Sequence, residues 1–432
     1  MIYPLKEGIN ITEDTREVNE NTYFLKTAQN SKYLDNLSSN VNIITPKELI
    51  DKWGLDSLKV IGITGTNGKT TTAAIIYSLL TDLGYGCGLQ GTRGFFLNDK
   101  RVEDKSLTTP SILQTLHNMK LSKDSGAKFF VMEISSHAIA QNRIQDINFA
   151  LKVFTNVTQD HLDYHKSVAE YRQVKSQFFL DDGLKLINKD EAKKIVFNQT
   201  KAYTYSLDEP SSFKIEAFSL SGGIKAAINH LGEMATFESN LVGVFNVYNL
   251  AAAVASVKLL TKNSLEEICN EVINFGGVSG RMEVISHNPT VIVDFAHTPD
   301  GILKVLESMK DRDIAVVFGA GGDRDKDKRP KMGLAAARYA KKLYITSDNP
   351  RSEEPEDIIA DIVAPLKGKE GVEVIVDRKE AINRAISELK NDEVLLILGK
   401  GDETYMDIKG KKIPFDDREV ARVALISNGY TI

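Results

Sequence analysis

The segment TGTNGKTT, residues 64–71, constrains this chain more than any other feature of the sequence. It follows the apolar run KVIGI at residues 59–63, which predicts a short buried strand, and precedes helix formers at residues 73–84. In that setting, small loop residues let backbone N–H groups face an anion, and the helix adds the positive end of its dipole. The segment therefore predicts a phosphate-binding loop in an α/β domain.

The residues of this loop indicate how a nucleoside triphosphate would be held. Lys69 can reach the outer phosphates, and Thr70 can offer its hydroxyl to Mg2+. The alternative is an ordinary turn that carries a surface lysine. Ile63 stands where the common P-loop pattern has glycine, so the match is to a variant of that pattern. The predicted nucleotide contacts in this segment are Gly65, Thr66, Asn67, Gly68, Lys69, Thr70 and Thr71.

Further polar side chains follow the next predicted strands. Glu133 lies at the C-terminal end of the apolar run KFFVMEI, residues 128–134, where a carboxylate can hold a metal near bound phosphates. The segment NVTQDHLDYH, residues 156–165, then gathers several possible ligands within ten residues. Helix capping explains Asp160 but not two histidines, so we favour a site over a capped helix start.

The order of the expected elements predicts an α/β protein of three domains. Strand and helix signals between residues 58 and 280 predict a central, mostly parallel sheet that carries the phosphate loop. Regular alternation from residue 291 to residue 398, which includes an expected helix over residues 330–341, predicts a second, doubly wound Rossmann-like domain. In such a domain, ligands lie beyond the C-terminal ends of the strands. Residues 1–57, 58–280 and 281–432 are the expected domains, the first being small.

Composition excludes several classes of protein. The 54 Lys and Arg residues against 59 Asp and Glu residues leave a net charge of −5, which disfavours a nucleic-acid-binding surface. The 2 cysteines, Cys87 and Cys269, exclude a disulfide framework or a multi-cysteine metal site. A secretory leader and an 18-residue apolar stretch are both missing, so we expect a cytoplasmic protein without membrane insertion.

The TGTNGKTT variant resembles the phosphate loop of the Mur ligases, the ATP-dependent amide-forming enzymes of peptidoglycan synthesis. The resemblance runs from about residue 59 to residue 428 and implies that ATP and Mg2+ are bound. It places Thr70, Glu133, His161 and Lys175 at the metal ions, with Lys175 carbamylated by CO2. From the sequence alone, Lys175 would be a solvated helix lysine. The resemblance also makes Lys69, His161 and Lys175 the catalytic residues.

The resemblance extends to both walls of the nucleotide site and to the first substrate. For ATP it adds Asn246, Arg281, Asp294 and His297. A UDP-N-acetylmuramoyl dipeptide would be bound by Thr15, Thr108, Thr109, Ser135, Gln141 and Arg143. Support is weaker at the N-terminus, where Asp14-Thr15-Arg16 has Thr in place of the family's Ser and the domain is short. Without the resemblance, Arg143 would equally suit a surface ion pair.

Two arginine loops in the last domain give the clue to the second substrate. Arg324 and Arg351 follow different predicted strands, and arginine binds carboxylates through two parallel hydrogen bonds. The Asp-Asn-Pro-Arg motif resembles that of the Mur ligases that add meso-diaminopimelate, and relatives that add lysine lack this arginine. Asp402 stands where the family usually has His. The implied contacts are Arg324, Asp348, Asn349, Arg351, Gly399 and Glu403.

The resemblance thus implies an ATP-dependent ligase that adds meso-diaminopimelate to the D-glutamate of a UDP-N-acetylmuramoyl dipeptide through an acyl phosphate. We expect it to act as a monomer. Folylpolyglutamate synthetase is the nearest rival, because it is similar around the phosphate loop but has no need of the Asp-Asn-Pro-Arg motif. A nucleotide-switched binding protein is a rival of another class, and it has no need of paired arginine loops.

Overall fold

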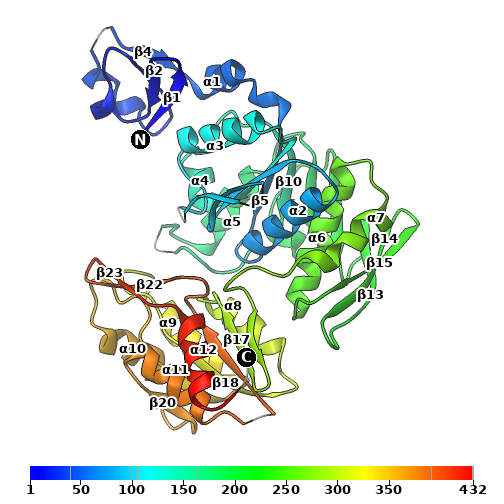
Figure 1. Ribbon diagram of the computed structural model, residues 1–432, viewed down its shortest axis with the longest axis vertical. Coiled ribbons are helices and arrows are strands. Elements are labelled where there is room, and N and C mark those ends of the chain that lie inside the picture. Colours follow the sequence, from blue (N-terminus) through cyan, green and yellow to red (C-terminus); the bar gives the residue numbers. More distant parts are fainter. Residues whose placement is uncertain (39, 99, 105–106, 163, 391, 431–432) are drawn as a thin grey trace.

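The computed structural model describes residues 1–38, 40–98, 100–104, 107–162, 164–390 and 392–430. Within them the chain forms three large sheets that follow one another along the sequence, and a small hairpin lies beside the last sheet. Figure 1 shows the first sheet at one end of the molecule, the central sheet beside it, and the third sheet at the opposite end. The predicted α/β fold with three domains is confirmed.

The N-terminal domain is a four-stranded sheet in the order β1-β2-β3-β4. The first pair is antiparallel, and the remaining pairs are parallel. A helix, α1 (Pro46–Trp53), leads out of it, begins at a capping box formed by Thr45 and Glu48, and ends at Gly54, whose φ is 62°. The strands are β1 (Ile2–Lys6), β2 (Ile9–Thr12), β3 (Thr22–Leu25) and β4 (Asn42–Ile44).

The central sheet has eleven strands in the order β15-β14-β13-β12-β11-β10-β5-β9-β6-β7-β8. Its middle, from β6 to β13, is parallel, and antiparallel pairs extend both edges. The parallel strands are β5 (Lys59–Thr64), β6 (Cys87–Gly91), β9 (Phe129–Ile134), β10 (Phe149–Phe154), β11 (Lys185–Asn188), β12 (Ala202–Ser206) and β13 (Phe213–Ser219). The edge strands are β7 (Gly94–Leu97), β8 (Lys100–Glu103), β14 (Ile224–His230) and β15 (Glu233–Ser239).

Helices cover both faces of this sheet, because its central strands are apolar on both sides. Ile61 and Ile63 of β5 pack in one core with α2 and α6, whereas Val60 packs in a second core with α1 and α3. The helices are α2 (Lys69–Asp82), α3 (Ile112–Asp124), α4 (Ser136–Ala140), α5 (Val168–Gln177), α6 (Val244–Leu260) and α7 (Leu265–Asn270). This packing puts the start of α2 at the C-terminal end of the sheet.

The C-terminal domain is a six-stranded sheet in the order β16-β17-β21-β18-β19-β20, parallel except for β16. Its strands are β16 (Glu283–His287), β17 (Thr290–Asp294), β18 (Asp313–Phe318), β19 (Ala340–Ile345), β20 (Val372–Val374) and β21 (Glu393–Leu398). Its helices are α8 (Pro299–Glu307), α9 (Lys328–Ala337), α10 (Pro355–Val363), α11 (Arg378–Ser387) and α12 (Asp417–Ser427). The hairpin strands are β22 (Tyr405–Ile408) and β23 (Lys411–Pro414).

The structure differs from the expected elements at one boundary in particular. The sequence predicts a helix over residues 330–341, but α9 ends at Ala337 and β19 already begins at Ala340. Tertiary packing decides this boundary, because Ala340 and Leu343 are buried in the core of the domain. Among the described residues, no helix is long and apolar enough to cross a membrane.

Candidate functional site

The phosphate loop connects β5 to α2, as the sequence predicts. Gly68 has a φ of 85°, a left-handed conformation that favours glycine. Neighbouring side chains approach the loop closely: a Cβ at Gly65 would lie 1.9 Å from Thr155 Oγ1, and one at Gly68 would lie 2.5 Å from Asn249 Oδ1. The loop therefore needs glycine at both positions, and its backbone can come close to a ligand.

Lys69 begins α2, where the backbone N–H groups of the first turn point away from the helix. Its ammonium donates hydrogen bonds to the carbonyls of Gly65 at 2.8 Å and Thr66 at 2.9 Å, so it lies over the loop. Burial lowers the pKa of Lys69, and the nearby charges of Glu133 and Asp160 oppose that shift. The loop thus presents a cation and helix N–H groups together, which suits a phosphate.

Glu133 is a buried carboxylate beside this loop. Its Oε2 accepts hydrogen bonds from Thr70 Oγ1 at 2.9 Å and from Thr92 Oγ1 at 3.1 Å. Its Oε1 accepts one from the backbone N–H of Thr92 at 2.9 Å. Sequence reasoning missed Thr92, although it follows β6, the strand adjacent to β9, and therefore reaches the same edge of the sheet.

The donor set at this edge fits Mg2+. Among the described residues there is no group of three or more His, Cys, Asp or Glu side chains that would form a closed cage. Mg2+ is instead commonly bound by one or two carboxylates together with substrate phosphates. The Thr70 hydroxyl and the Glu133 carboxylate, 2.9 Å apart beside the phosphate loop, are oxygen ligands of that kind.

β5 lies between β9, which carries Glu133, and β10. His161 and Lys175 follow β10 in the sequence and lie on that side of the phosphate loop, opposite Glu133. His161 pairs with Asp160 at 3.3 Å, and burial lowers the pKa of the imidazole, so the ring is neutral near pH 7. Lys175 is 1% exposed, and its ammonium donates to Thr64 Oγ1 at 3.2 Å and to the Gly65 carbonyl at 3.0 Å. Burial and the charge of Lys69 hold the pKa of Lys175 well below its usual value.

The C-terminal domain supplies the other wall. Arg281 stacks over the ring of Phe295 at 4.2 Å, and the Asp294 carboxylate accepts hydrogen bonds from the backbone of Met282 and Ala296. Across the domain junction, Asn67 Nδ2 of the phosphate loop donates to Asp300 Oδ2 at 3.0 Å. The two domains therefore meet directly at the predicted nucleotide site.

A cavity of about 580 Å3 lies at this junction. Its walls include every predicted ATP contact except Gly65, and also Glu133 and His161. Lys175 is not one of its lining residues. Asn249 and Asp190 line it too, although sequence reasoning did not single them out. The predicted ATP contacts in its walls are Thr66, Asn67, Gly68, Lys69, Thr70, Thr71, Asn246, Arg281, Asp294 and His297.

Five of the six residues predicted for the UDP substrate lie together on the central domain. Thr109 Oγ1 donates to the Glu133 carbonyl at 2.9 Å and accepts from the Ser135 N–H at 2.9 Å. Arg143 donates to the Thr109 carbonyl at 3.0 Å and also to Gln141. Thr108 Oγ1 lies 3.3 Å from Thr92 Oγ1, and this hydrogen bond links Thr108 to the same group through Thr92. The sixth residue, Thr15, lies in the N-terminal domain, on the short helix η1 (Thr15–Glu17).

The six residues predicted for the amino acid come from the loops after β18, β19 and β21. A Cβ at Gly321 would lie 2.8 Å from Arg351 Nη1 and 3.8 Å from Arg324 Cγ, so both arginine side chains pass close to Gly321. Asn349 Nδ2 donates to Glu403 Oε2 at 2.8 Å. A Cβ at Gly399 would lie 2.7 Å from an oxygen of the Asp348 carboxylate.

The six residues predicted for the amino acid form what we call the amino-acid rim. Buried cations balance the negative charge of its carboxylate Asp348. Burial alone would raise the pKa of Asp348, but the positive charges of Lys400 and Arg378 bring it below its usual value. Asp348 is therefore a carboxylate at neutral pH. Arg324 also lines the junction cavity, so the amino-acid rim adjoins the predicted ATP site.

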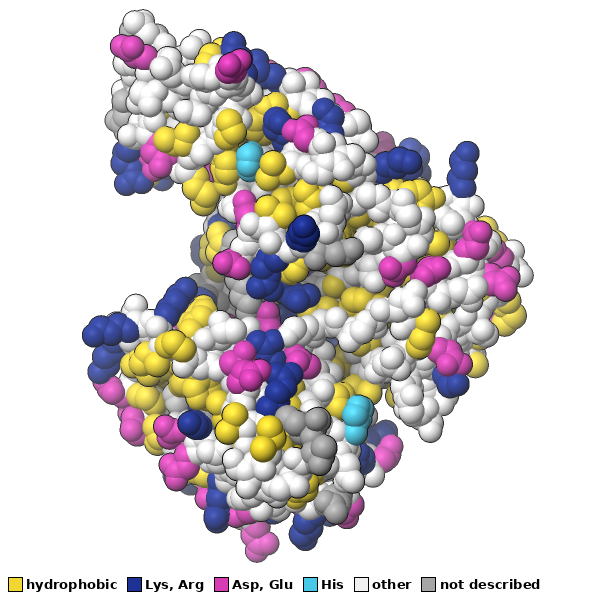
Figure 2. All heavy atoms as spheres, in the orientation of Figure 1, with side chains coloured by type: hydrophobic (Ala, Val, Ile, Leu, Met, Phe, Trp, Pro, Cys, Tyr) yellow, Lys and Arg dark blue, Asp and Glu magenta, His cyan; other side chains and the backbone are white. Residues whose placement is uncertain are grey.

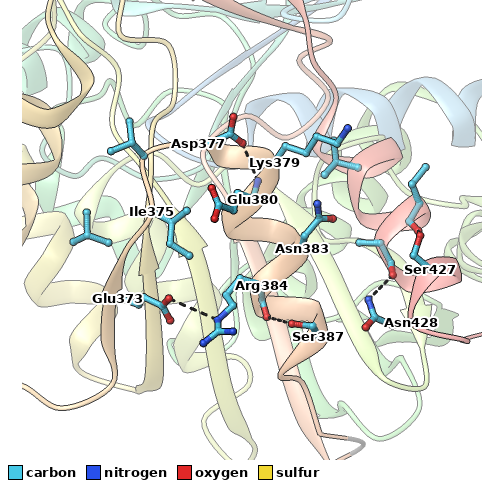
Figure 3. A pocket seen from close by; sticks show the side chains of 15 residues that line it. Glu373, Ile375, Asp377, Lys379, Glu380, Asn383, Arg384, Ser387, Ser427 and Asn428 are labelled. Carbon is cyan, nitrogen blue, oxygen red and sulfur yellow. Dashed lines mark hydrogen bonds and ion pairs between the residues drawn. The ribbon is translucent and has the colours of Figure 1, made fainter.

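A second cavity, of about 1020 Å3, lies on the outer face of the C-terminal domain, between β20, α11 and α12 (Figure 3). Some of the polar side chains on its walls pair with one another or with the backbone. Arg384 lies 3.7 Å from Glu373, and Asp377 accepts a hydrogen bond from the backbone of Glu380. None of the predicted site residues lines it.

The fold and the junction site define a P-loop enzyme whose phosphate site is completed by a second domain. Comparison with known families agrees: residues 63–257 match the Mur ligase middle domain, and residues 280–401 match the Mur ligase glutamate ligase domain. The UDP-N-acetylmuramoyl-L-alanyl-D-glutamate--2,6-diaminopimelate ligase of Wolinella succinogenes is 50% identical over 418 residues, which cover 96% of each chain. The chain belongs to the Mur ligase family, and it is an ATP-dependent, Mg2+-using ligase that forms amide bonds.

Solved structures resemble this chain over most of its length. One, of a UDP-N-acetylmuramoyl-L-alanyl-D-glutamate--2,6-diaminopimelate ligase, has a TM-score of 0.69 and 29% identity, and the match covers 98% of this chain and 95% of that one. The folylpolyglutamate synthase of Mycobacterium tuberculosis has a TM-score of 0.67 at 18% identity, with coverage of 89% and 94%. At this identity, the similarity to the folylpolyglutamate synthase shows a shared fold only.

Proposed function

We propose that this ligase joins meso-diaminopimelate to the D-glutamate of UDP-N-acetylmuramoyl-L-alanyl-D-glutamate during peptidoglycan precursor synthesis. The observation that carries the proposal is that Arg324 and Arg351 both pass close to Gly321, at a rim that also holds Asp348 and Glu403. Arginines suit the carboxylate at the far end of diaminopimelate, and the carboxylates suit its ammonium group. The names of the similar ligases support the same substrate.

The reaction would proceed in two steps. A carboxylate oxygen of the D-glutamate attacks the γ-phosphorus of ATP, the bond to the bridging oxygen breaks, and ADP leaves. The amine of diaminopimelate then attacks the acyl carbon, a proton leaves the nitrogen, and inorganic phosphate departs as the amide forms. Lys69 and the first N–H groups of α2 would stabilise the charge on the transferring phosphoryl group. Loss of one such electrostatic donor typically costs roughly 3 to 4 kcal/mol in the barrier.

Thr70 and Glu133 would hold Mg2+, which when bound would neutralise phosphate charge, and His161 would be available on the other side of the loop. Arg281, Asp294 and His297 would hold the nucleotide from the C-terminal domain, and residues 281–432 would therefore bind both ATP and the amino acid. Residues 58–280 would bind ATP and the dipeptide end of the first substrate, and residues 1–57 would bind its UDP end through Thr15.

We also propose that Lys175 carries a carbamate. Its lowered pKa supports this, because only an uncharged amine can attack CO2, forming a C–N bond and releasing a proton. The product is an anion beside Lys69 and the phosphate loop. It would offset the charge of Lys69 and help to hold a cation near the phosphates.

The decisive experiment is a coupled assay of ADP release with the purified chain and ATP. Sustained ADP release is expected only when both the UDP-dipeptide and meso-diaminopimelate are present, and mass spectrometry should find the UDP-tripeptide. Turnover with a folate and glutamate instead would establish the rival ligase activity. Nucleotide binding without any ligation would favour a nucleotide-switched binding protein.

We also propose that the enzyme is cytoplasmic, because ATP is an intracellular substrate. Since one chain carries every proposed contact, we propose that it acts as a monomer and without nucleic acid.

A further inference from the structure

A buried lysine lies at the centre of the amino-acid rim. Lys400 follows Gly399 at the end of β21, and its side chain is 0% exposed. Its ammonium donates to Asn349 Oδ1 at 3.2 Å, to Glu403 Oε2 at 3.0 Å and to the Tyr405 carbonyl at 2.7 Å. An ammonium group has three hydrogens to donate, so these three acceptors fix its position.

These contacts determine how Asn349 and Glu403 are presented. Asn349 Oδ1 accepts from Lys400 and from the backbone N–H of Asp407 at 2.8 Å, and the amide nitrogen must therefore point the other way, toward Glu403. Glu403 Oε2 thus receives donors from two different loops. Without the lysine, the Asp407 N–H would still hold Asn349 Oδ1, but Glu403 Oε2 would lose its charged donor and keep only the Asn349 amide.

The charge of Lys400 also matters for the same rim. Asp348 and Glu403 are both carboxylates, and Lys400 is the leading positive charge acting on Asp348. A buried cation beside two carboxylates offsets their mutual repulsion. Lys400 thus offsets part of the negative charge that Asp348 and Glu403 offer to the ammonium group of an incoming amino acid.

We propose that Lys400 is a positioning residue for the amino-acid substrate: its three hydrogen bonds hold Glu403 and Asn349 in place, and its charge lies beside the carboxylates of the rim. The proposal deepens the proposed function and rests on it. Lys400 does not itself touch the amino acid or the reacting atoms. Its loss is therefore expected to weaken amino-acid binding and to leave ATP and the UDP-dipeptide unaffected.

A second buried lysine, Lys185, serves as a matched control. It distinguishes a positioning role of Lys400 from the alternative that Lys400 only stabilises the fold. Lys185 is also 0% exposed, and its ammonium also makes three hydrogen bonds. All three acceptors are backbone carbonyls, those of Asp181, Gly183 and Thr200, in the central domain away from the rim. Replacing either lysine removes one buried cation, but only Lys400 contacts side chains of the rim.

The test compares Lys400→Met, Lys400→Gln and Lys185→Met with the wild-type enzyme. For each we would measure the melting temperature and the separate KM values for meso-diaminopimelate, ATP and the UDP-dipeptide. Lys400→Met should raise the KM for diaminopimelate roughly tenfold to a hundredfold, the effect of losing charge-assisted hydrogen bonds, with the other two KM values within about twofold. Lys185→Met should lower the melting temperature alone.

Lys400→Gln removes the charge but keeps two N–H donors on a side chain one atom shorter, and it serves if the methionine variant does not fold. An unchanged KM for diaminopimelate in the folded variant, or an equal rise in all three KM values, would overturn the proposal. Wild-type turnover with diaminopimelate reports on the proposed function separately. If the wild-type enzyme uses another amino acid, the same comparison is made with that amino acid, and the Lys400 inference stands or falls on its own.

Discussion

Removing the arginine of the Asp-Asn-Pro-Arg loop tests the proposed amino-acid specificity most directly. Arg351 Nη1 already donates to the Gly322 carbonyl at 2.6 Å, which holds the guanidinium in place. The remaining edge of the guanidinium can then pair with the far carboxylate of diaminopimelate, a group that lysine lacks. Arg351→Ala should therefore weaken diaminopimelate binding and bring its KM closer to that for lysine.

The size of the effect follows from the half-buried position of Arg351. Breaking a fully buried ion pair costs about 3 to 5 kcal/mol, whereas exposed pairs contribute about 0 to 1 kcal/mol. For this intermediate site we expect about 2 to 3 kcal/mol, which is roughly a 30- to 150-fold loss of preference over lysine. Alanine retains the Cβ, so the backbone, whose φ is 51° at this position, carries the same strain in both proteins.

The assay is steady-state kinetics with both amino acids on the wild-type enzyme and the variant, with ATP and the UDP-dipeptide saturating. Arg384→Ala is the control, because Arg384 lies on the outer face of the same domain, is 53% exposed and pairs with Glu388 at 2.8 Å. It should leave both KM values unchanged. If Arg351→Ala retains the wild-type preference for diaminopimelate over lysine, the arginine only supports the loop and the reasoning is refuted.

Three further predictions concern the phosphate loop and its surroundings. Lys69→Ala should abolish product formation with an unchanged circular dichroism spectrum, and near-normal turnover would contradict its assigned role. Lys175→Ala should be almost inactive and partly rescued by acetate. Because the pKa of Lys175 is lowered, its uncharged amine persists to lower pH than an ordinary lysine, and 13C NMR with labelled bicarbonate should show a carbamate at pH 7 that is lost on acidification. Glu133→Gln should raise the Mg2+ concentration needed for half-maximal turnover, with unaltered Mg2+ dependence counting against a metal role.

The elements that local pattern determines could be predicted from the sequence. The apolar run before the phosphate loop and the helix formers after it correspond to β5 and α2, because burial on both faces requires a continuous apolar strand. The alternation in the last domain likewise predicts β17 to β21, since each strand is a short apolar run between polar turns. Boundaries were less predictable, as the early end of α9 shows.

The contacts between distant segments could not be predicted in this way. Thr92 meets Glu133 across 41 residues, and Lys400 meets Asn349 across 51 residues. Neither residue lies in a pattern that differs locally from an ordinary turn, so only the pairing of strands reveals its partner. The positions of Thr108, Thr109 and Arg143 in one group also depend on the adjacency of β6 and β9 at the sheet edge.

The domain junction links the two halves of the proposed site. Gly280 has a φ of 68°, and a Cβ at this position would lie 2.0 Å from the backbone nitrogen of Asp402. The junction is therefore packed directly against the loop that carries Lys400 and Glu403. On the other side of the junction, Asn67 of the phosphate loop bonds Asp300 of the C-terminal domain. A rotation of the C-terminal domain about this junction would therefore move its nucleotide contacts and its amino-acid rim together relative to the central domain. The reason is that the same short connection contacts both parts.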